Sequence, residues 1–191
     1  RHRPRPAMAA RGGAALETTL AAGLAFVAGF SDAVCVRRFG VFGAMQTGNA
    51  VYLGMALSNS GPAAAAVFVA VIAANVAGVV AMDSGVALLG PRWSPAAALL
   101  PPGLLLACEL LANTPSPLAP WAVCFAAAAM GMQNALTLSG ALAVNTTIVT
   151  GNLQKIGVHA ARLLRGDKPS PKDVTQTTKC VAVTCATIAG S

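Results

Sequence analysis

The sequence predicts an all-α fold, a polytopic membrane helix bundle of six to seven transmembrane helices. Charged residues make up 10% of the 191 residues and hydrophobic residues 55%, whereas a soluble domain carries about 25% charged residues. Residues 39–82 and 110–154 contain no ionisable side chain apart from Tyr52 and Cys124. Because a transmembrane helix needs about 20 apolar residues, each of these stretches has room for two crossings.

A repeated motif gives the third indication of this fold. The phrase Gly-Phe-Ser-Asp-Ala at residues 29–33 is followed by Thr-Gly-Asn at 47–49, and Gly-Met-Gln-Asn-Ala at 131–135 is followed by Thr-Gly-Asn at 150–152. The first phrase recurs after 102 residues (29 to 131) and the second after 103 (47 to 150). This predicts two parallel three-helix repeats joined by a connecting helix, since an even number of crossings separates equivalent helices. Sugar transporters of the SWEET type have a similar topology.

The first repeat, residues 16–89, is expected to contain three helices. The first spans residues 17–36 and ends at the turn Arg-Arg-Phe-Gly, and the short second one spans residues 47–57 and ends at Ser-Asn-Ser-Gly-Pro. The third runs through apolar sequence from residue 63 to residue 82 or 89. Residues 1–15 are rich in Arg, Pro and Gly, and we expect them to be a disordered basic segment.

A connecting loop and helix, residues 90–118, lead into the second repeat, residues 119–191. The loop contains two prolines, and its helix is expected over residues 96–112. In the second repeat, a helix at 121–142 corresponds to the first helix and one at 150–164 to the short second helix. The last apolar run begins near residue 181, and we expect it to be truncated, because about ten residues cannot span a bilayer.

Basic residues gather in two clusters that indicate membrane orientation. Four arginines lie in residues 1–11 and five basic residues in residues 162–179, against three arginines in the loops on the other side. This excess predicts an N-terminus on the cytoplasmic or matrix side. Aromatic residues do not alternate with the basic ones, as base stacking would require, so no nucleic-acid partner is expected.

The sequence predicts neither an enzyme nor a bound cofactor. Five cysteines without a Cys-x-x-Cys pair argue against both a disulfide and a metal site. Ser139 and His159 are the one pair that resembles a nucleophile and its base, and neither lies in a catalytic motif. We therefore expect no catalytic residues.

The two Thr-Gly-Asn motifs are the centre of the predicted substrate site. Threonine can cap a helix, glycine lets a ligand approach the backbone, and asparagine offers donors and an acceptor. Two such helix starts that face each other would bind a small polar solute within the membrane; alternatively, they only cap two re-entrant helices. The predicted binding residues are Asp32, Thr47, Gly48, Asn49, Gln133, Asn134, Thr150, Gly151 and Asn152.

Three ionisable residues are candidates for ion coupling or ion pairing. Asp32 would bind a proton or cation within the bundle, or else lie near the interface and pair with Arg37 or Arg38. Lys155 would pair with Glu109 or Asp32 in the core, or else extend to the inner surface.

Small residues at a spacing of four mark two helix faces for close packing in lipid. These are Ala21, Ala25, Gly29 and Ala33, and Ala127, Gly131, Ala135 and Ser139. Because the two faces coincide under the repeat, we expect the first and fifth helices to share a central contact.

The doubled motif resembles the YoaK family of uncharacterised multi-pass membrane proteins, from residue 16 to the C-terminus. The family pattern matches at all nine predicted binding residues. The resemblance implies a polytopic membrane protein, and family members are described as candidate small-molecule transporters. The predicted function is therefore transport of a small polar solute across a lipid bilayer. The competing interpretation is a non-transporting structural or assembly subunit of a membrane complex, or a homo-oligomer, in which the same asparagines hold helices together.

Overall fold

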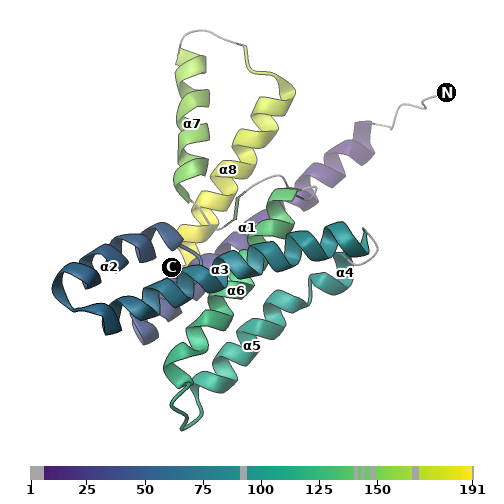
Figure 1. The fold of residues 1–191 in the computed structure, drawn as a ribbon. Helices are drawn as coiled ribbons and strands as arrows, with labels where there is room; N and C mark the ends of the chain where they lie inside the picture. The colour runs from purple at the N-terminus through teal and green to yellow at the C-terminus, as the bar shows by residue number, and fades with distance from the viewer. Residues whose placement is uncertain are drawn as a thin grey trace.

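The computed structural model describes residues 7–90, 94–139, 142, 145–146, 149–164 and 168–190, and the regular structure within them is helical (Figure 1). In chain order the helices are α1 (Ala7–Phe39), α2 (Gln46–Asn59), α3 (Pro62–Leu89), α4 (Ser94–Ala97), α5 (Leu100–Ala112), the 3-10 helix η2 (Ala119–Ala122), α6 (Val123–Ser139), α7 (Val149–Leu164) and α8 (Pro171–Gly190). The all-α prediction is confirmed.

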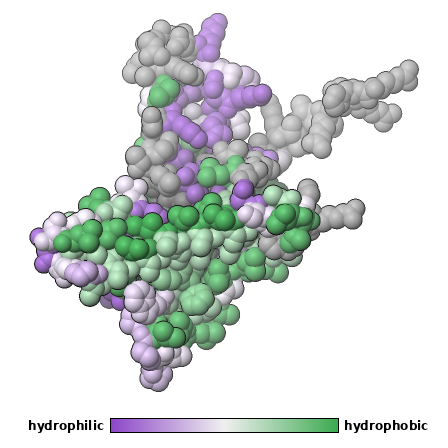
Figure 2. Space-filling view, in the orientation of Figure 1, coloured by the Kyte–Doolittle hydropathy of each residue, from purple (hydrophilic) through white to green (hydrophobic). Residues whose placement is uncertain are grey.

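Three helical stretches are long and apolar enough to cross a membrane: Ala15–Phe39, Pro62–Leu89 and Ala119–Leu138. Leu100–Ala112 is a shorter apolar helix, and α2 and α7 have 14 and 16 residues, below the roughly 20 that a crossing needs. Figure 2 shows apolar side chains over α3 and its neighbours, whereas hydrophilic residues gather around α7 and α8.

Several helix boundaries differ from the sequence prediction. Helix α1 begins at Ala7, within the segment expected to be disordered, because alanine is a strong helix former; residues 1–6 lie outside the described part of the chain. Helix α8 begins at Pro171, ten residues before the expected start near residue 181. The Ser170 Oγ accepts a hydrogen bond from the Asp173 N–H at 3.2 Å, and the Asp173 Oδ2 accepts one from the Ser170 N–H at 3.2 Å. This reciprocal cap explains the early start.

The fourth predicted helix is split into α4 and α5. Pro101 and Pro102 follow the break and occupy the first turn of α5, where a missing N–H costs nothing. The fifth predicted helix, residues 121–142, starts as η2 and continues as α6 to Ser139. Leu142 lies in a turn, and residues 140 and 141 are outside the described part.

Helices α1 and α8 pack closely along their C-terminal halves. A Cβ atom on Gly29 would overlap the backbone carbonyl of Thr187, and one on Gly190 would overlap that of Phe26. Only glycine therefore allows the two backbones to approach to this distance.

Helices α3 and α6 form a second pair of the same kind. A Cβ atom on Gly131 would overlap the carbonyl of Asn75, and one on Gly78 would overlap that of Ala128. The Asn75 side chain also donates a hydrogen bond to the Ala127 carbonyl at 3.0 Å, which satisfies a polar group within the apolar interface.

The expected central contact between the first and fifth helices, now α1 and α6, is wrong. These helices touch only briefly, and each packs instead along a different partner, α8 or α3. The small-residue faces do mediate close packing, as predicted. Their partners were misassigned because the pattern marks a face and does not specify the helix that covers it.

An ion pair between a buried lysine and a partly exposed glutamate joins the N-terminal parts of α1 and α8. Lys179 Nζ lies 2.5 Å from Glu17 Oε2, and the lysine side chain is 7% exposed. Because Glu17 precedes Gly29 in α1, and Lys179 precedes Thr187 in α8, the two helices run parallel. From the sequence, Lys179 was expected in the basic cluster on the inner side of the membrane, and its pairing with Glu17 was not predicted.

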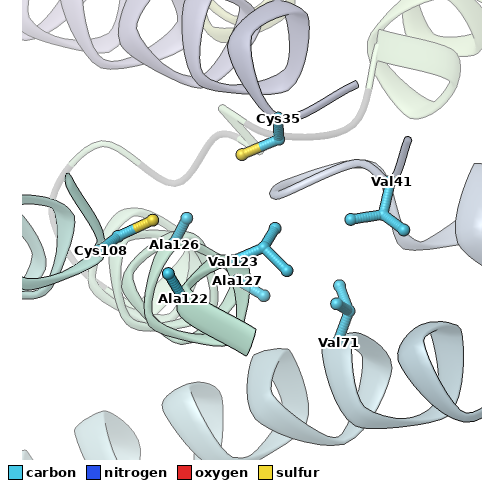
Figure 3. Close-up of a cluster of buried hydrophobic side chains, with 8 residues drawn as sticks. All are labelled: Cys35, Val41, Val71, Cys108, Ala122, Val123, Ala126 and Ala127. Atoms are coloured by element: carbon cyan, nitrogen blue, oxygen red, sulfur yellow. The ribbon is translucent and has the colours of Figure 1, made fainter. Parts of the chain in front are cut away.

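The largest core cluster lies where α3, α5 and α6 meet the end of α1 (Figure 3). Its buried members are Cys35, Val41, Val71, Cys108, Ala122, Val123, Ala126 and Ala127. Val41 belongs to the loop after α1, so this loop is drawn into the core instead of lying on the surface.

We expect Gly131→Ala to destabilise the fold by about 1–3 kcal/mol, because the new methyl group overlaps a backbone carbonyl that cannot move independently of its helix. Gly23→Ala is the control, since a Cβ atom there would meet nothing within 4 Å, and an exposed helical glycine gains about 0.5–1 kcal/mol on this change. Denaturation in mixed micelles measures both free energies of unfolding. Equal effects of the two substitutions would contradict the close α3–α6 contact.

Glu17→Gln is expected to destabilise the fold by about 1–3 kcal/mol, because it leaves the buried Lys179 ammonium without its counter-charge. The double variant Glu17→Gln, Lys179→Met should recover much of this loss, since no charge then remains buried. Thermal unfolding of the single and double variants tests this. A double variant that is less stable than Glu17→Gln alone would show that the pair is not the relevant contact.

Candidate functional site

The loop between α1 and α2 folds back into the bundle. Gly40 ends α1 with a positive φ of 71°, a conformation that favours glycine. Val41 is 1% exposed and Ala44 5% exposed, so both lie in the core. In an apolar surrounding, the backbone N–H and C=O groups of such a loop need partners within the protein.

Asn49 supplies those partners from the first turn of α2. Its Oδ1 accepts a hydrogen bond from the Phe42 N–H at 2.8 Å, and its Nδ2 donates to the Phe42 carbonyl at 2.7 Å and to Gln46 Oε1 at 2.9 Å. The side chain is completely buried. Gln46 in turn donates to the Gly43 carbonyl at 2.8 Å. The Asn49 amide is therefore fully engaged with its own loop, which agrees with the structural alternative for this motif.

The other two members of the first motif have different roles. A Cβ atom on Gly48 would lie 2.6 Å from the Phe42 ring, so glycine leaves room for that ring. Thr47 is exposed, and the N-cap position of α2 belongs to Met45, without a side-chain cap hydrogen bond. The expectation that Thr47 caps the helix is therefore wrong, because α2 begins one residue earlier than the motif.

Asp32 holds the same loop from α1. Asp32 is 8% exposed, and its Oδ1 accepts a hydrogen bond from the Ala44 N–H at 2.6 Å. Among the described residues it forms no ion pair with Arg37 or Arg38, and Arg38 pairs with Glu109 instead.

An open pocket of about 490 Å³ borders Asp32, between α1, α8 and the α1–α2 loop. Its lining residues are Gly29, Asp32, Ala33, Val36, Arg37, Phe42, Met45, Thr187 and Ile188. This volume lies within the range of small-molecule sites. Apart from one aspartate and one arginine, the walls are apolar or carry a single hydroxyl group.

The second Thr-Gly-Asn motif repeats the contact made by Asn49. Asn152 is 1% exposed and donates from Nδ2 to the Asn145 carbonyl at 2.9 Å, seven residues earlier, as Asn49 does to Phe42. The Asn152 Oδ1 is buried without a hydrogen-bond partner among the described residues. The side chain of Thr150 and the surroundings of Gly151 lie outside the described part of the chain.

Gln133 and two threonines form a polar cluster next to this second loop. Gln133 Nε2 donates to the Leu24 carbonyl at 3.1 Å and to Thr146 Oγ1 at 3.3 Å, and the hydroxyl groups of Thr146 and Thr137 lie 3.4 Å apart. The Asn134 Oδ1 is buried and has no partner within the described residues. Sequence reasoning selected Gln133 and Asn134 and missed both threonines, although Thr137 lies one turn after Gln133.

The two motifs do not face each other across one site. Helix α2 packs on α3 and α7 packs on α8, and Figure 1 shows the two short helices on different arms of the molecule. The asparagine of each motif instead bonds to the carbonyl seven residues before it, ahead of its own helix.

The predicted partners of Glu109 and Lys155 also change. Glu109 receives hydrogen bonds from Arg38 Nη1 at 3.1 and 3.2 Å and from Asn113 Nδ2 at 2.6 Å. Arg38 Nη2 additionally donates to the Ala112 carbonyl at 2.9 Å, so this network fastens the end of α1 to the end of α5. Lys155 is exposed, and in the described structure it pairs with neither Glu109 nor Asp32. The Ser139 side chain, one half of the nucleophile–base pair weighed above, lies outside the described residues.

We expect Asn49→Ala to lower the free energy of unfolding by about 1–3 kcal/mol, because the buried Phe42 N–H and C=O lose their partners. Thr47→Ala, in the same motif, should leave stability within about 0.5 kcal/mol of the original, since that side chain is exposed. Denaturation in mixed micelles provides the measurement. Similar losses for both variants would contradict the role given to Asn49.

Comparison with known proteins identifies a family of unknown function. No curated protein and no solved structure matches the chain. A family model described as "Protein of unknown function (DUF1275)" matches residues 20–191, which include both repeated motifs and the pocket. The chain therefore belongs to the DUF1275 family.

Proposed function

We propose that this protein is an integral membrane protein that moves a small polar solute across the bilayer, with the pocket beside Asp32 as its binding site. The observation that carries the proposal is a carboxylate buried within a long apolar helix at the wall of an open pocket. Ionisable groups in membrane-spanning segments are costly, and they typically mark substrate or ion pathways.

The apolar surface supports a location within the bilayer. Leu88 is 83% exposed, Leu99 72% and Ile188 65%, and Figure 2 shows a continuous apolar area over α3 and its neighbours. A soluble monomer rarely exposes so large an apolar patch, whereas lipid tails would cover it without cost.

The packing of the long helices supports two parallel repeats, α1–α2–α3 and α6–α7–α8, joined by α5. Gly29 of α1 faces Thr187 of α8, and Gly131 of α6 faces Asn75 of α3. The first helices are offset by 102 residues (29 to 131) and the third helices by 112 (75 to 187). The two contacts are thus equivalent, and in each the first helix of one repeat packs on the third helix of the other. Three of the helices in these contacts, α1, α3 and α6, contain the stretches long and apolar enough to cross a membrane. The excess of basic residues in residues 1–11 and 162–179 favours a cytoplasmic or matrix-side N-terminus.

The resemblance to the YoaK family, described as candidate small-molecule transporters, agrees with this proposal. In the proposed transporter, Asn49 and Asn152 hold the segments that precede α2 and α7. Asp32 binds the solute or a coupled proton or cation. The neutral counterpart of Asp32, Asn134, makes the two halves chemically different, as an asymmetric coupling site requires.

A thermal-shift screen of purified protein against polar metabolites, followed by counterflow in proteoliposomes with any solute found, tests the proposal. Asp32→Asn keeps an acceptor for the Ala44 N–H and removes only the charge, and we expect it to weaken solute binding at least about tenfold. Asp83→Asn is the matched control, since this change falls on an exposed residue of α3. A solute that binds and is transported equally well by the Asp32→Asn protein would overturn the proposal.

The non-transporting subunit remains the second candidate, because the amide groups of Asn49 and Asn152 are engaged with their own loops. It predicts that no solute shifts the melting temperature, and that substitutions of both asparagines lower stability without an effect on any flux.

A further inference from the structure

Two side chains of opposite charge, Asp32 and Arg37, line the pocket. Arg37 follows Asp32 by five residues in α1, and both line the pocket wall. The neighbouring Arg38 is held by Glu109 and the end of α5. Arg37 has no hydrogen bond or ion pair with any residue that the structure describes, so its guanidinium is available to a ligand.

The geometry points to a zwitterion with an apolar substituent as the solute of this pocket, the chemistry of a neutral α-amino acid; this inference rests on the proposed transport function. A helical separation of five residues corresponds to a rise of about 7.5 Å. Because both side chains line the same pocket, an ammonium group can be placed at Asp32 and a carboxylate at Arg37. Guanidinium groups match carboxylates in a two-point geometry.

The remaining wall suits the apolar part of such a molecule. Val36, Phe42, Met45 and Ile188 present aliphatic and aromatic surface to the pocket. Few polar groups among apolar walls are typical of sites that bind small molecules in one orientation. A solute with a single charge would leave either Asp32 or Arg37 without compensation.

The charge pair occurs in only one half of the chain. At a spacing of 102 residues, Asp32 corresponds to Asn134 and Arg37 to Ser139, so both charges are absent from the corresponding part of α6. General membrane anchoring would need no such paired charges on one helix. Their restriction to the side that holds the pocket favours a role in binding.

Three probes with the same butyl chain separate the contributions of the two charges: norleucine, hexanoate, which lacks the ammonium group, and pentylamine, which lacks the carboxylate. Isothermal titration of the full chain in nanodiscs gives each Kd. We expect norleucine to bind about tenfold to hundredfold more tightly than either analogue, the range for one charge-assisted hydrogen-bonded contact.

Two variants assign the charges. Asp32→Asn should remove the preference for norleucine over hexanoate, and Arg37→Gln the preference for norleucine over pentylamine. Arg37→Gln keeps the test valid if Asp32→Asn fails to fold, because Arg37 makes no contact that the described fold depends on. Lys172→Gln, which removes an exposed positive charge at the start of α8, should leave all three Kd values unchanged.

Two results would overturn the inference: no binding of norleucine, or equal Kd values for the three probes. If another polar solute then binds and is transported in a manner that requires Asp32, the zwitterion inference is wrong and the transport proposal stands. If no solute from the thermal-shift screen binds either, both are wrong.

Discussion

The close approach of two pairs of parallel helices is the constraint on which the other features of this fold depend. Lipid tails are as apolar as leucine, so helices in a bilayer associate through backbone-level packing instead of a hydrophobic driving force. Gly29 and Gly190 provide this for α1 and α8, and Gly78 and Gly131 for α3 and α6. The first contact places Thr187 at the wall of the pocket. The second brings together the helices that enclose Val41.

This packing buries Val41, Ala44 and Thr146 in the segments before α2 and α7. The backbone of these segments then requires hydrogen-bond partners within the protein, which Asn49 and Asn152 supply. Irregular backbone at membrane depth is tolerated only where the protein itself satisfies its polar groups. Each asparagine binds the carbonyl seven residues before it, and Asp32 binds the Ala44 N–H from the other side of the first loop. The same contact that stabilises the loop also fixes the Asp32 carboxylate at the pocket. Loop folding and the proposed solute recognition therefore share this residue.

The sequence was sufficient to predict the helices but not their partners. Apolar runs interrupted by Gly and Pro located α1, α3 and α6, since those interruptions act within a few residues, but they missed the polar first half of α8. Small residues at a spacing of four identified the packing faces of α1 and α6, whereas the covering helices depend on contacts between distant segments, such as Lys179 with Glu17, 162 residues apart. For Asn49, solute binding and a structural role both remained open from the sequence, because a residue pattern does not show whether the amide contacts a solute or its own backbone; in the structure it bonds to Phe42 and Gln46.

The asymmetry between two similar halves is the strongest link from this structure to a function. The α1–α8 interface carries the ion pair of Glu17 with Lys179 at one end and the pocket charges Asp32 and Arg37 towards the other. At the corresponding spacings, 102 for α6 and 112 for α3, the chain has Ala119, Val67, Asn134 and Ser139. One interface has therefore kept neutral packing while the other carries charges that cost free energy in a bilayer. Packing alone gives no reason for Asp32 and Arg37 at the pocket, since the neutral interface is equally close, whereas the proposed recognition of a zwitterionic solute does.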